Sequence, residues 1–217
     1  VYDRYREIGG LLTYGIPEFK LEKNIVLKRR KILEGLGVKF ILNFEVDQSK
    51  MKEIEKKSDA VFLGLGTYEA IKGNLSGEGK EGVVEALPYL IKNTEYLMSE
   101  EDAESLNFKD QKVVVLGGGD TAMDCVRSAI RQGAVSVKCL YRRDRANMPG
   151  SQREVQNAEE EGVVFEWLAA PNGFVGDPVT AVCVQKMRLG APDATGRRSP
   201  EVIEGSDYDE PADRVIT

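Results

Sequence analysis

Six consecutive residues follow directly after a short apolar run in the second half of the chain. The run covers residues 113–116, and the six that follow are Gly117, Gly118, Gly119, Asp120, Thr121 and Ala122. Glycine at the first and third positions allows a tight turn and close approach of the backbone to a pyrophosphate, and a small sixth residue allows close packing of helix on strand. Free amides and the positive dipole end of the following helix would bind the phosphates. This pattern predicts a dinucleotide-binding site, and the alternative is a turn that merely needs glycine.

Two arginines indicate which dinucleotide would bind. Arg142 and Arg143 end the next predicted strand, roughly 20 or more residues after the glycines, where an acidic residue usually binds the ribose of NAD or FAD. Guanidinium groups bind a 2′-phosphate through charge-assisted hydrogen bonds, whereas a carboxylate would repel it. We therefore predict NADPH. The alternative is that Arg142, Arg143 and Arg145 form a solvated charge run, and Asp144 leaves open which arginine points toward the site.

The chain contains no histidine and three cysteines, Cys125, Cys139 and Cys183. The absence of histidine excludes Ser-His-Asp and Cys-His nucleophilic sites and histidine-based zinc sites within this chain. The cysteines form no CxxC pair, so we expect neither iron–sulfur ligation by this chain alone nor a disulfide framework. We predict that they pack as small buried hydrophobic residues, and we predict no metal site.

Composition bounds the class of protein and its partners. The chain has 217 residues, 41% of them hydrophobic, and a formal net charge of −6, which fits a globular protein and argues against a nucleic-acid partner. Its first residues show no signal peptide, and no apolar stretch reaches the about 18 residues that a membrane helix needs. We therefore expect a cytoplasmic protein without a membrane partner.

Hydrophobic periodicity predicts an α/β fold with a βαβ unit at residues 113–141. Residues 151 and 154 suggest a capping box for the helix that follows, and the acidic run 159–161 suggests a solvated helix face. Residues 73–82 are expected to form a linker, 99–110 a charged connector, and 179–189 with 201–203 an antiparallel hairpin. The other predicted helices cover residues 22–36, 51–57, 84–98, 120–132 and 152–161, and the other predicted strands cover 38–44, 60–63 and 163–168.

Four segments carry a resemblance to one family. They are residues 8–17 (IGGLLTYGIP), 117–124 (GGGDTAMD), 141–143 with 148–151 (YRR and MPGS), and 187–193 (MRLGAPD). With these segments the chain resembles the small subunit of bacterial NADPH-dependent glutamate synthase. The first two are shared with a wider group of flavin-linked electron-input modules that includes the amino-terminal part of dihydropyrimidine dehydrogenase, and the last is more particular to the glutamate synthase small subunit.

The resemblance implies a two-dinucleotide flavoprotein fold, in which a Rossmann-like NADPH domain is inserted into a FAD domain. Residues 1–69 would be a partial FAD-binding domain, 70–205 the NADPH-binding domain, and 206–217 the return into the FAD-binding domain. Asp3 would lie at the flavin ribose. The other residues that the resemblance places near the flavin are Gly9, Gly10, Leu11, Leu12 and Gly66.

The departures from the family concern the flavin and the clusters. The first FAD glycine loop of the family lies before Val1, its second flavin loop lies beyond Thr217, and its cysteine-rich segment for 4Fe–4S clusters is absent. Gly64-Leu65-Gly66 also replaces the usual Ala-Thr-Gly. We therefore expect this chain to bind NADPH, and to bind FAD poorly or not at all.

The resemblance further implies an activity: hydride transfer from NADPH to FAD, and electron transfer through iron–sulfur clusters to a large subunit that forms glutamate from glutamine and 2-oxoglutarate. Transfer between two cofactors requires mainly proximity and orientation, so no residue is predicted to be catalytic, and this chain alone is expected to be inactive. The alternatives are a related flavin-linked reductase module, a stand-alone NADP(H)-binding module, and a methyltransferase, which the two arginines disfavour. Unpaired strand edges could also support a homo-oligomer.

Overall fold

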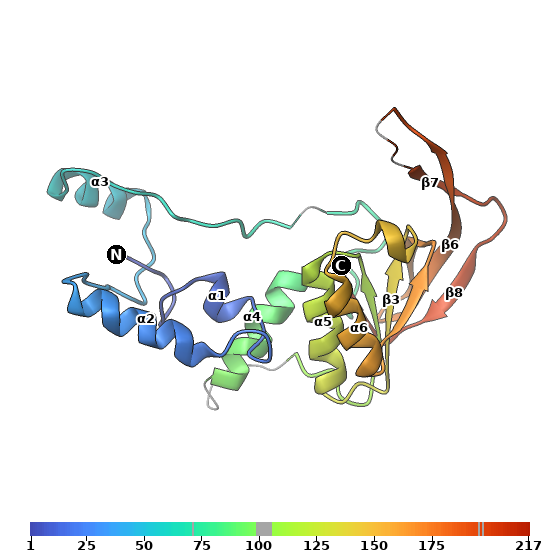
Figure 1. Cartoon of the computed structure of the whole chain (residues 1–217), viewed down its shortest axis with the longest axis horizontal. Coiled ribbons are helices and arrows are strands. Elements are labelled where there is room, and N and C mark those ends of the chain that lie inside the picture. Colours follow the sequence, from blue (N-terminus) through green and yellow to red (C-terminus); the bar gives the residue numbers. More distant parts are fainter. Residues whose placement is uncertain (71, 99–105, 195, 197) are drawn as a thin grey trace.

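A computed structural model describes residues 1–70, 72–98, 106–194, 196 and 198–217 of the chain. Figure 1 shows α2 and α3 at one end of the molecule and the two sheets at the other, with α1 beside α4 between them, and the long segment that follows α3 runs along one side. Most of the predicted charged connector, residues 99–105, lies outside the described residues.

A five-stranded sheet organises the second part of the chain. All of its neighbouring strands are parallel, and their order is β1-β9-β2-β3-β4. The predicted βαβ unit is confirmed, since a helix that begins at Asp120 connects β2 to its parallel neighbour β3. The strands are β1 (Val83–Val84), β2 (Lys112–Leu116), β3 (Ser136–Tyr141), β4 (Val164–Trp167) and β9 (Arg214–Ile216).

The parallel sheet is buried on both faces because its strands are apolar at consecutive positions. Val113 and Val115 pack with three helices on one face, and Val114 packs with a second sheet on the other. The helices are α4 (Ala86–Met98), α5 (Asp120–Arg131) and α6 (Gln152–Glu160). The second sheet contains β5 (Ala169–Gly176), β6 (Val179–Pro192), β7 (Arg198–Val202) and β8 (Tyr208–Pro211).

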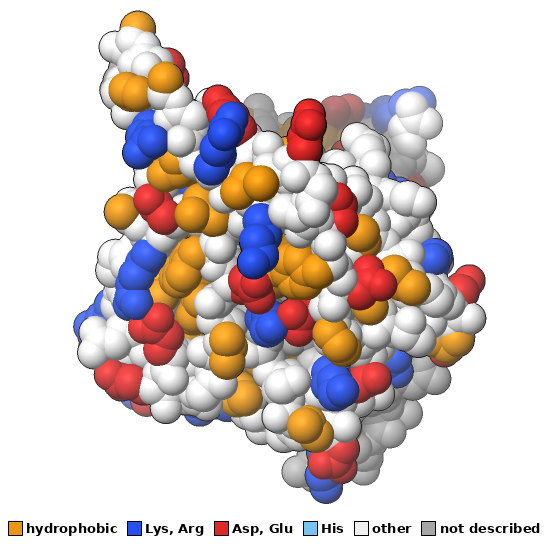
Figure 2. Space-filling model, turned by 90° about the vertical axis from the view of Figure 1, so that its right-hand side faces the viewer, with side chains coloured by type: hydrophobic (Ala, Val, Ile, Leu, Met, Phe, Trp, Pro, Cys, Tyr) orange, Lys and Arg blue, Asp and Glu red, His pale blue; other side chains and the backbone are white. Residues whose placement is uncertain are grey.

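The long strand β6 is the centre of this antiparallel sheet. Its first half pairs with β5 and β8, and its second half pairs with β7, which confirms the predicted hairpin. The outer halves of β6 and β7 project from the body as a two-stranded ribbon (Figure 1). Figure 2 shows that on this side of the molecule basic and acidic side chains alternate, with hydrophobic patches between them.

The segment 206–217 belongs to these two sheets. β8 pairs with β6, and β9 lies between β1 and β2. The predicted return into a FAD-binding domain at residue 206 stays a prediction, because strand pairing alone does not divide the chain into domains.

The amino-terminal part contains α1 (Leu11–Tyr14), α2 (Lys23–Gly35) and α3 (Gln48–Lys57). Two predicted strands in it were wrong. Residues 38–44 form only a single bridge, from Ile41 to Tyr2, and residues 60–70 have no regular structure. A strand requires a hydrogen-bonding neighbour along its length, and residues 60–63 pair with no described segment. Their apolar side chains are consequently exposed, Phe62 by 93%.

The predicted capping box of α6 was also wrong. Ser151 is the N-cap residue, but its side chain makes no cap hydrogen bond, and the Glu154 carboxylate binds Arg127 instead. Cys125 and Cys139 are buried as predicted, whereas Cys183 is half-buried; all three are free thiols. Within the described residues, no helix is both long and apolar enough to cross a membrane, and no three His, Cys, Asp or Glu side chains gather as metal ligands.

Candidate nucleotide-binding site

A cavity of about 820 Å³ opens at the carboxyl ends of the parallel strands. Leu116 ends β2, Tyr141 ends β3, Val84 ends β1 and Thr217 follows β9, and all four line it. The chain runs from β2 outward to β3 and β4, while β9 and β1 lie on the opposite side. Ligands of open α/β sheets bind at such a change of direction, outside the carboxyl ends of the strands. The fold therefore places the cavity where a nucleotide is expected.

The glycine loop forms part of the cavity wall. Gly117 and Gly118 line it, and Gly117 has a φ of +130°, which favours glycine. A Cβ on Gly118 would lie 2.5 Å from the Tyr141 ring, so this position also requires glycine, whereas a Cβ on Gly119 would meet open space. Gly119 is the N-cap of α5 and no side-chain hydrogen bond caps this end of the helix within the described residues. The first amides of α5 therefore remain available to an anion.

The remaining predicted residues of the loop do not line the cavity. Ala122 is buried, close below Gly117, which fits the predicted packing of helix on strand. Thr121 is exposed. The Asp120 carboxylate accepts a hydrogen bond from the amide of Ser151, at 3.1 Å. Asp120 thus binds a backbone amide in this structure, an outcome that the position alone does not reveal.

The loop 148–151 fixes the conformation of the glycine loop. The Gly150 amide donates to the Gly118 carbonyl at 2.9 Å, and a Cβ on Gly150 would lie only 2.9 Å from that same oxygen. The Tyr141 hydroxyl donates to the Asn147 carbonyl at 3.0 Å. Tyr141, Asn147 and Pro149 also line the cavity. In the sequence, the Met-Pro-Gly-Ser motif carried only the resemblance and the predicted capping box of Ser151, and its contact with the glycine loop could not be predicted.

A buried thiol contacts the backbone of the glycine loop. Cys139 lies on β3, is fully buried, and its Sγ is 3.2 Å from the Gly117 carbonyl oxygen. Burial raises the pKa of this thiol to about 12, so the thiol stays protonated at neutral pH and can donate to that carbonyl. Cys139 is therefore both a core residue and a contact of the loop.

The three arginines that follow β3 have different surroundings. Arg145 forms a two-pronged ion pair with Glu159, at 2.8 and 2.9 Å. Asp144 accepts hydrogen bonds from the amide and side chain of Asn147, and so caps the short 3₁₀ helix η1 (Arg145–Asn147). Neither Arg142 nor Arg143 forms an ion pair within the described residues, and both line the cavity. Arg145 and Asp144 are thus already engaged, whereas Arg142 and Arg143 remain available to a ligand.

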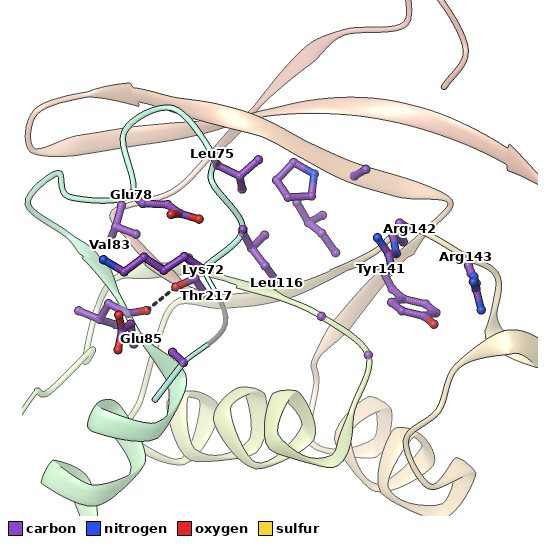
Figure 3. Close-up of a pocket in the computed structure, with 18 of the residues that line it drawn as sticks. Lys72, Leu75, Glu78, Val83, Glu85, Leu116, Tyr141, Arg142, Arg143 and Thr217 are labelled. Atoms are coloured by element: carbon purple, nitrogen blue, oxygen red, sulfur yellow. Dashed lines mark hydrogen bonds between the residues drawn. The ribbon is translucent and has the colours of Figure 1, made fainter. Parts of the chain in front are cut away.

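One nitrogen of the Arg143 side chain lacks a hydrogen-bond partner. Its Nε is buried and has no hydrogen-bond partner, although buried polar atoms in folded proteins are almost always hydrogen-bonded. Figure 3 shows Arg142 and Arg143 beside Tyr141 at one end of the cavity. An anionic ligand at that end would lie beside two guanidinium groups that form no ion pair within the described residues.

The opposite end of the cavity contains residues that the sequence did not single out. Lys72, Glu78, Glu85 and Thr217 lie there, across the cavity from the arginines (Figure 3). The Thr217 amide donates to the Val84 carbonyl at 2.9 Å, which ties β9 to β1 at the cavity floor. These residues come from separate segments and follow no short motif, so sequence spacing could not bring them together.

The residues predicted for the flavin side lie in the amino-terminal part. The Asp3 carboxylate accepts from the Tyr5 amide at 3.0 Å. A Cβ on Gly9 would lie 2.6 Å from Thr13 Oγ1 and 2.9 Å from Val26 Cγ1, so Gly9 serves the packing of α1 on α2.

Other predicted flavin residues are brought together only in part. Gly10 and Gly66 both adjoin Tyr68, while Leu11 is half-buried and Leu12 is 53% exposed. Neither this cavity nor a smaller one of about 240 Å³ between residues 17–23 and α4 and α5 is lined by any of the predicted flavin residues. The flavin assignments therefore stay predictions.

Known proteins share this architecture and sequence. The putative glutamate synthase [NADPH] small chain of Cereibacter sphaeroides is 59% identical over 219 residues, which cover all of this chain and 53% of that protein. The glutamate synthase [NADPH] small chain of Escherichia coli (strain K12) is 50% identical over 223 residues, covering 100% and 47%. The chain spans about half the length of these curated relatives.

The structural comparison agrees with the predicted fold class. FprA of Mycobacterium tuberculosis, solved in complex with NADPH, matches with a TM-score of 0.81 and 17% identity, over 99% of this chain and 62% of FprA. Residues 12–194 match the family model of the pyridine nucleotide-disulphide oxidoreductases. This match covers most of the chain, and the chain therefore belongs to the pyridine nucleotide-disulphide oxidoreductase family.

Proposed function

We propose that the chain binds NADPH in the cavity at the carboxyl ends of β1, β9, β2 and β3. The observation that carries this proposal is one cavity lined both by the glycine loop and by Arg142 and Arg143, two arginines without an ion-pair partner among the described residues. Arg142 and Arg143 would bind the 2′-phosphate, and the open amino end of α5 beside Gly117 and Gly118 would bind the pyrophosphate. The nicotinamide would then extend toward Glu85 and Thr217.

In the wider proposal the chain is the electron-input part of a protein of the glutamate synthase small-chain type. Support comes from the names of the relatives, which include NADPH, and from the family match. NADPH supplies a hydride, and the residues of this chain bind and orient it. FAD, 4Fe–4S clusters and the glutamate synthase large subunit belong to this proposal as parts of the whole assembly. We assign no step of the electron transfer to the predicted flavin residues of this chain.

A titration with NADPH and NADH tests the proposed site. We expect wild-type chain to prefer NADPH. The double variant Arg142→Ala, Arg143→Ala should lose roughly tenfold or more in NADPH affinity, because one hydrogen bond to a charged group is worth about 1.5–3 kcal/mol. NADH affinity should change little, since NADH lacks the 2′-phosphate.

Arg145→Ala is the matched control for this titration. It removes a neighbouring guanidinium of the same charge, but one that is engaged with Glu159 outside the cavity. We expect its NADPH affinity to stay close to that of wild-type chain. Equal loss in the control and in the double variant would refute a specific 2′-phosphate site and would leave only a general charge effect.

A further inference from the structure

Residues 17–23, here called the docking segment, attach the amino-terminal part to the nucleotide-binding part. The aromatic ring of Phe19 lies under two guanidinium groups of α5, with the Cζ atoms of Arg127 and Arg131 at 4.5 and 4.4 Å from its centre. Both arginines are held by Glu161, and Arg127 also by Glu154. We expected the acidic run 159–161 to be a solvated face, but Glu161 is part of this contact.

The next residue adds an ion pair between the two parts. Lys20 Nζ lies 2.7 Å from Asp124 Oδ1 and 3.6 Å from Glu154 Oε2, and the Asp124 side chain is only 10% exposed. Burial raises the pKa of Asp124, and the nearby carboxylates of Glu154 and Asp120 act in the same direction. The ammonium group of Lys20 therefore compensates a carboxylate that would otherwise be buried without a partner.

The docking segment also contacts α1. Lys23 is buried, and its Nζ donates to the backbone carbonyl of Leu12 in α1 and to that of Ile16, which follows the helix. Lys23 thereby gives a partner to a carbonyl in the last turn of α1. A continuous series of contacts thus runs from α1 through the docking segment to Asp124 and Arg127 of α5, the helix that begins at the glycine loop.

We propose that Phe19 and Lys20 are positioning residues that hold α1 at a fixed distance from the nucleotide cavity. The proposal rests on the proposed function, because electron transfer from NADPH needs a defined geometry between the two parts. Neither residue lines the cavity of about 820 Å³. Their removal should therefore alter the relative position of the two parts and leave NADPH affinity unchanged.

Time-resolved energy transfer can measure this distance in the whole chain. Trp167, the single tryptophan of the sequence, is the donor on β4. The acceptor is attached through Lys28→Cys on the exposed face of α2, in a Cys183→Ser background, because Cys125 and Cys139 are buried. We expect a narrow distance distribution in this parent protein and a broader one after Phe19→Leu with Lys20→Met.

Two further variants separate positioning from general destabilisation. Lys20→Arg keeps Phe19 and the charge at position 20 and should retain the narrow distribution, and Lys52→Met, which removes an exposed lysine of α3, should retain it too. NADPH affinity should stay within about twofold of the parent in all of them, and circular dichroism and thermal unfolding verify that each is folded.

The outcomes for the two proposals are distinct. A folded double variant with a distribution as narrow as the parent's overturns the positioning role of Phe19 and Lys20. A broad distribution in the double variant together with a narrow one in Lys20→Arg supports it. Failure of the parent protein to bind NADPH would count against the proposed function instead, and the distance distributions would still decide the positioning role.

Discussion

At the scale of single residues, the partners of a side chain decide its role more than its type does. Arg142, Arg143 and Arg145 look equivalent in the sequence. In the structure Glu159 engages Arg145, while Arg143 keeps a buried Nε without a partner. Their distance to the glycines singled out Arg142 and Arg143 in the sequence, and both line the cavity. The engagement of Arg145 by a glutamate 14 residues further on could be seen only in the fold.

The contribution of Glu161 to the free energy of unfolding should depend on pH. Burial opposes ionisation of its carboxyl group, but hydrogen bonds from Arg127 and Arg131 outweigh burial and lower its pKa below the ordinary 4.5. A lowered pKa in the folded state stabilises the protein above the unfolded pKa, and this contribution is lost as the pH falls through the folded value. Glu161→Gln should therefore cost about 1–2 kcal/mol at pH 7, and the cost should shrink below pH 4.5.

Urea unfolding at a series of pH values measures this effect. Glu160→Gln is the control, because Glu160 is exposed and bonds only Gln156 among the described residues; its free energy of unfolding should follow that of the wild-type chain. A difference between Glu161→Gln and wild type that stays constant from pH 7 down to pH 3 would contradict the account.

At the scale of elements, the contact between the glycine loop and the loop 148–151 leaves no room for an added side chain. A Cβ on Gly150 would lie 2.9 Å from the Gly118 carbonyl oxygen, a backbone atom that cannot turn away. We expect Gly150→Ala to displace the glycine loop, to lower stability by about 1–3 kcal/mol, and to weaken NADPH binding. Gly35→Ala in α2, where a Cβ meets nothing within 4 Å, should leave NADPH binding unchanged; calorimetric titration measures both variants.

Elements with strong local signals were predictable, and elements that depend on distant partners were not. The apolar run of β2, the glycines and the periodicity of α5 placed the βαβ unit correctly. The strand predicted at 60–63 failed because no described segment pairs with it. β5 was missed because Pro171 and Gly173 interrupt its pattern, although pairing with β6 makes it a strand. The far end of the cavity joins Lys72, Glu85 and Thr217, which only the sheet order brings together.

At the scale of the whole molecule, the amino-terminal part exposes several large apolar side chains to solvent. Phe62 is 93% exposed, Leu36 77% and Leu65 75%, and adjacent exposed apolar groups favour association. We expect sedimentation velocity to show association that grows with protein concentration, and to show less of it after Phe62→Ser with Leu65→Ser. A single monomeric species at every concentration would contradict this expectation and the predicted homo-oligomer.

Phosphorus NMR of the bound nucleotide reports directly on whether Arg142 and Arg143 bind the 2′-phosphate of NADPH. A phosphate monoester has a second pKa of about 6, and guanidinium groups that bind its dianion lower that pKa. Titrated in complex with wild-type chain, the 2′-phosphate should show a lowered pKa and a shifted resonance, and both should return toward the free values in Arg142→Ala, Arg143→Ala. A 2′-phosphate that titrates in the wild-type complex as it does in free NADPH would contradict the account.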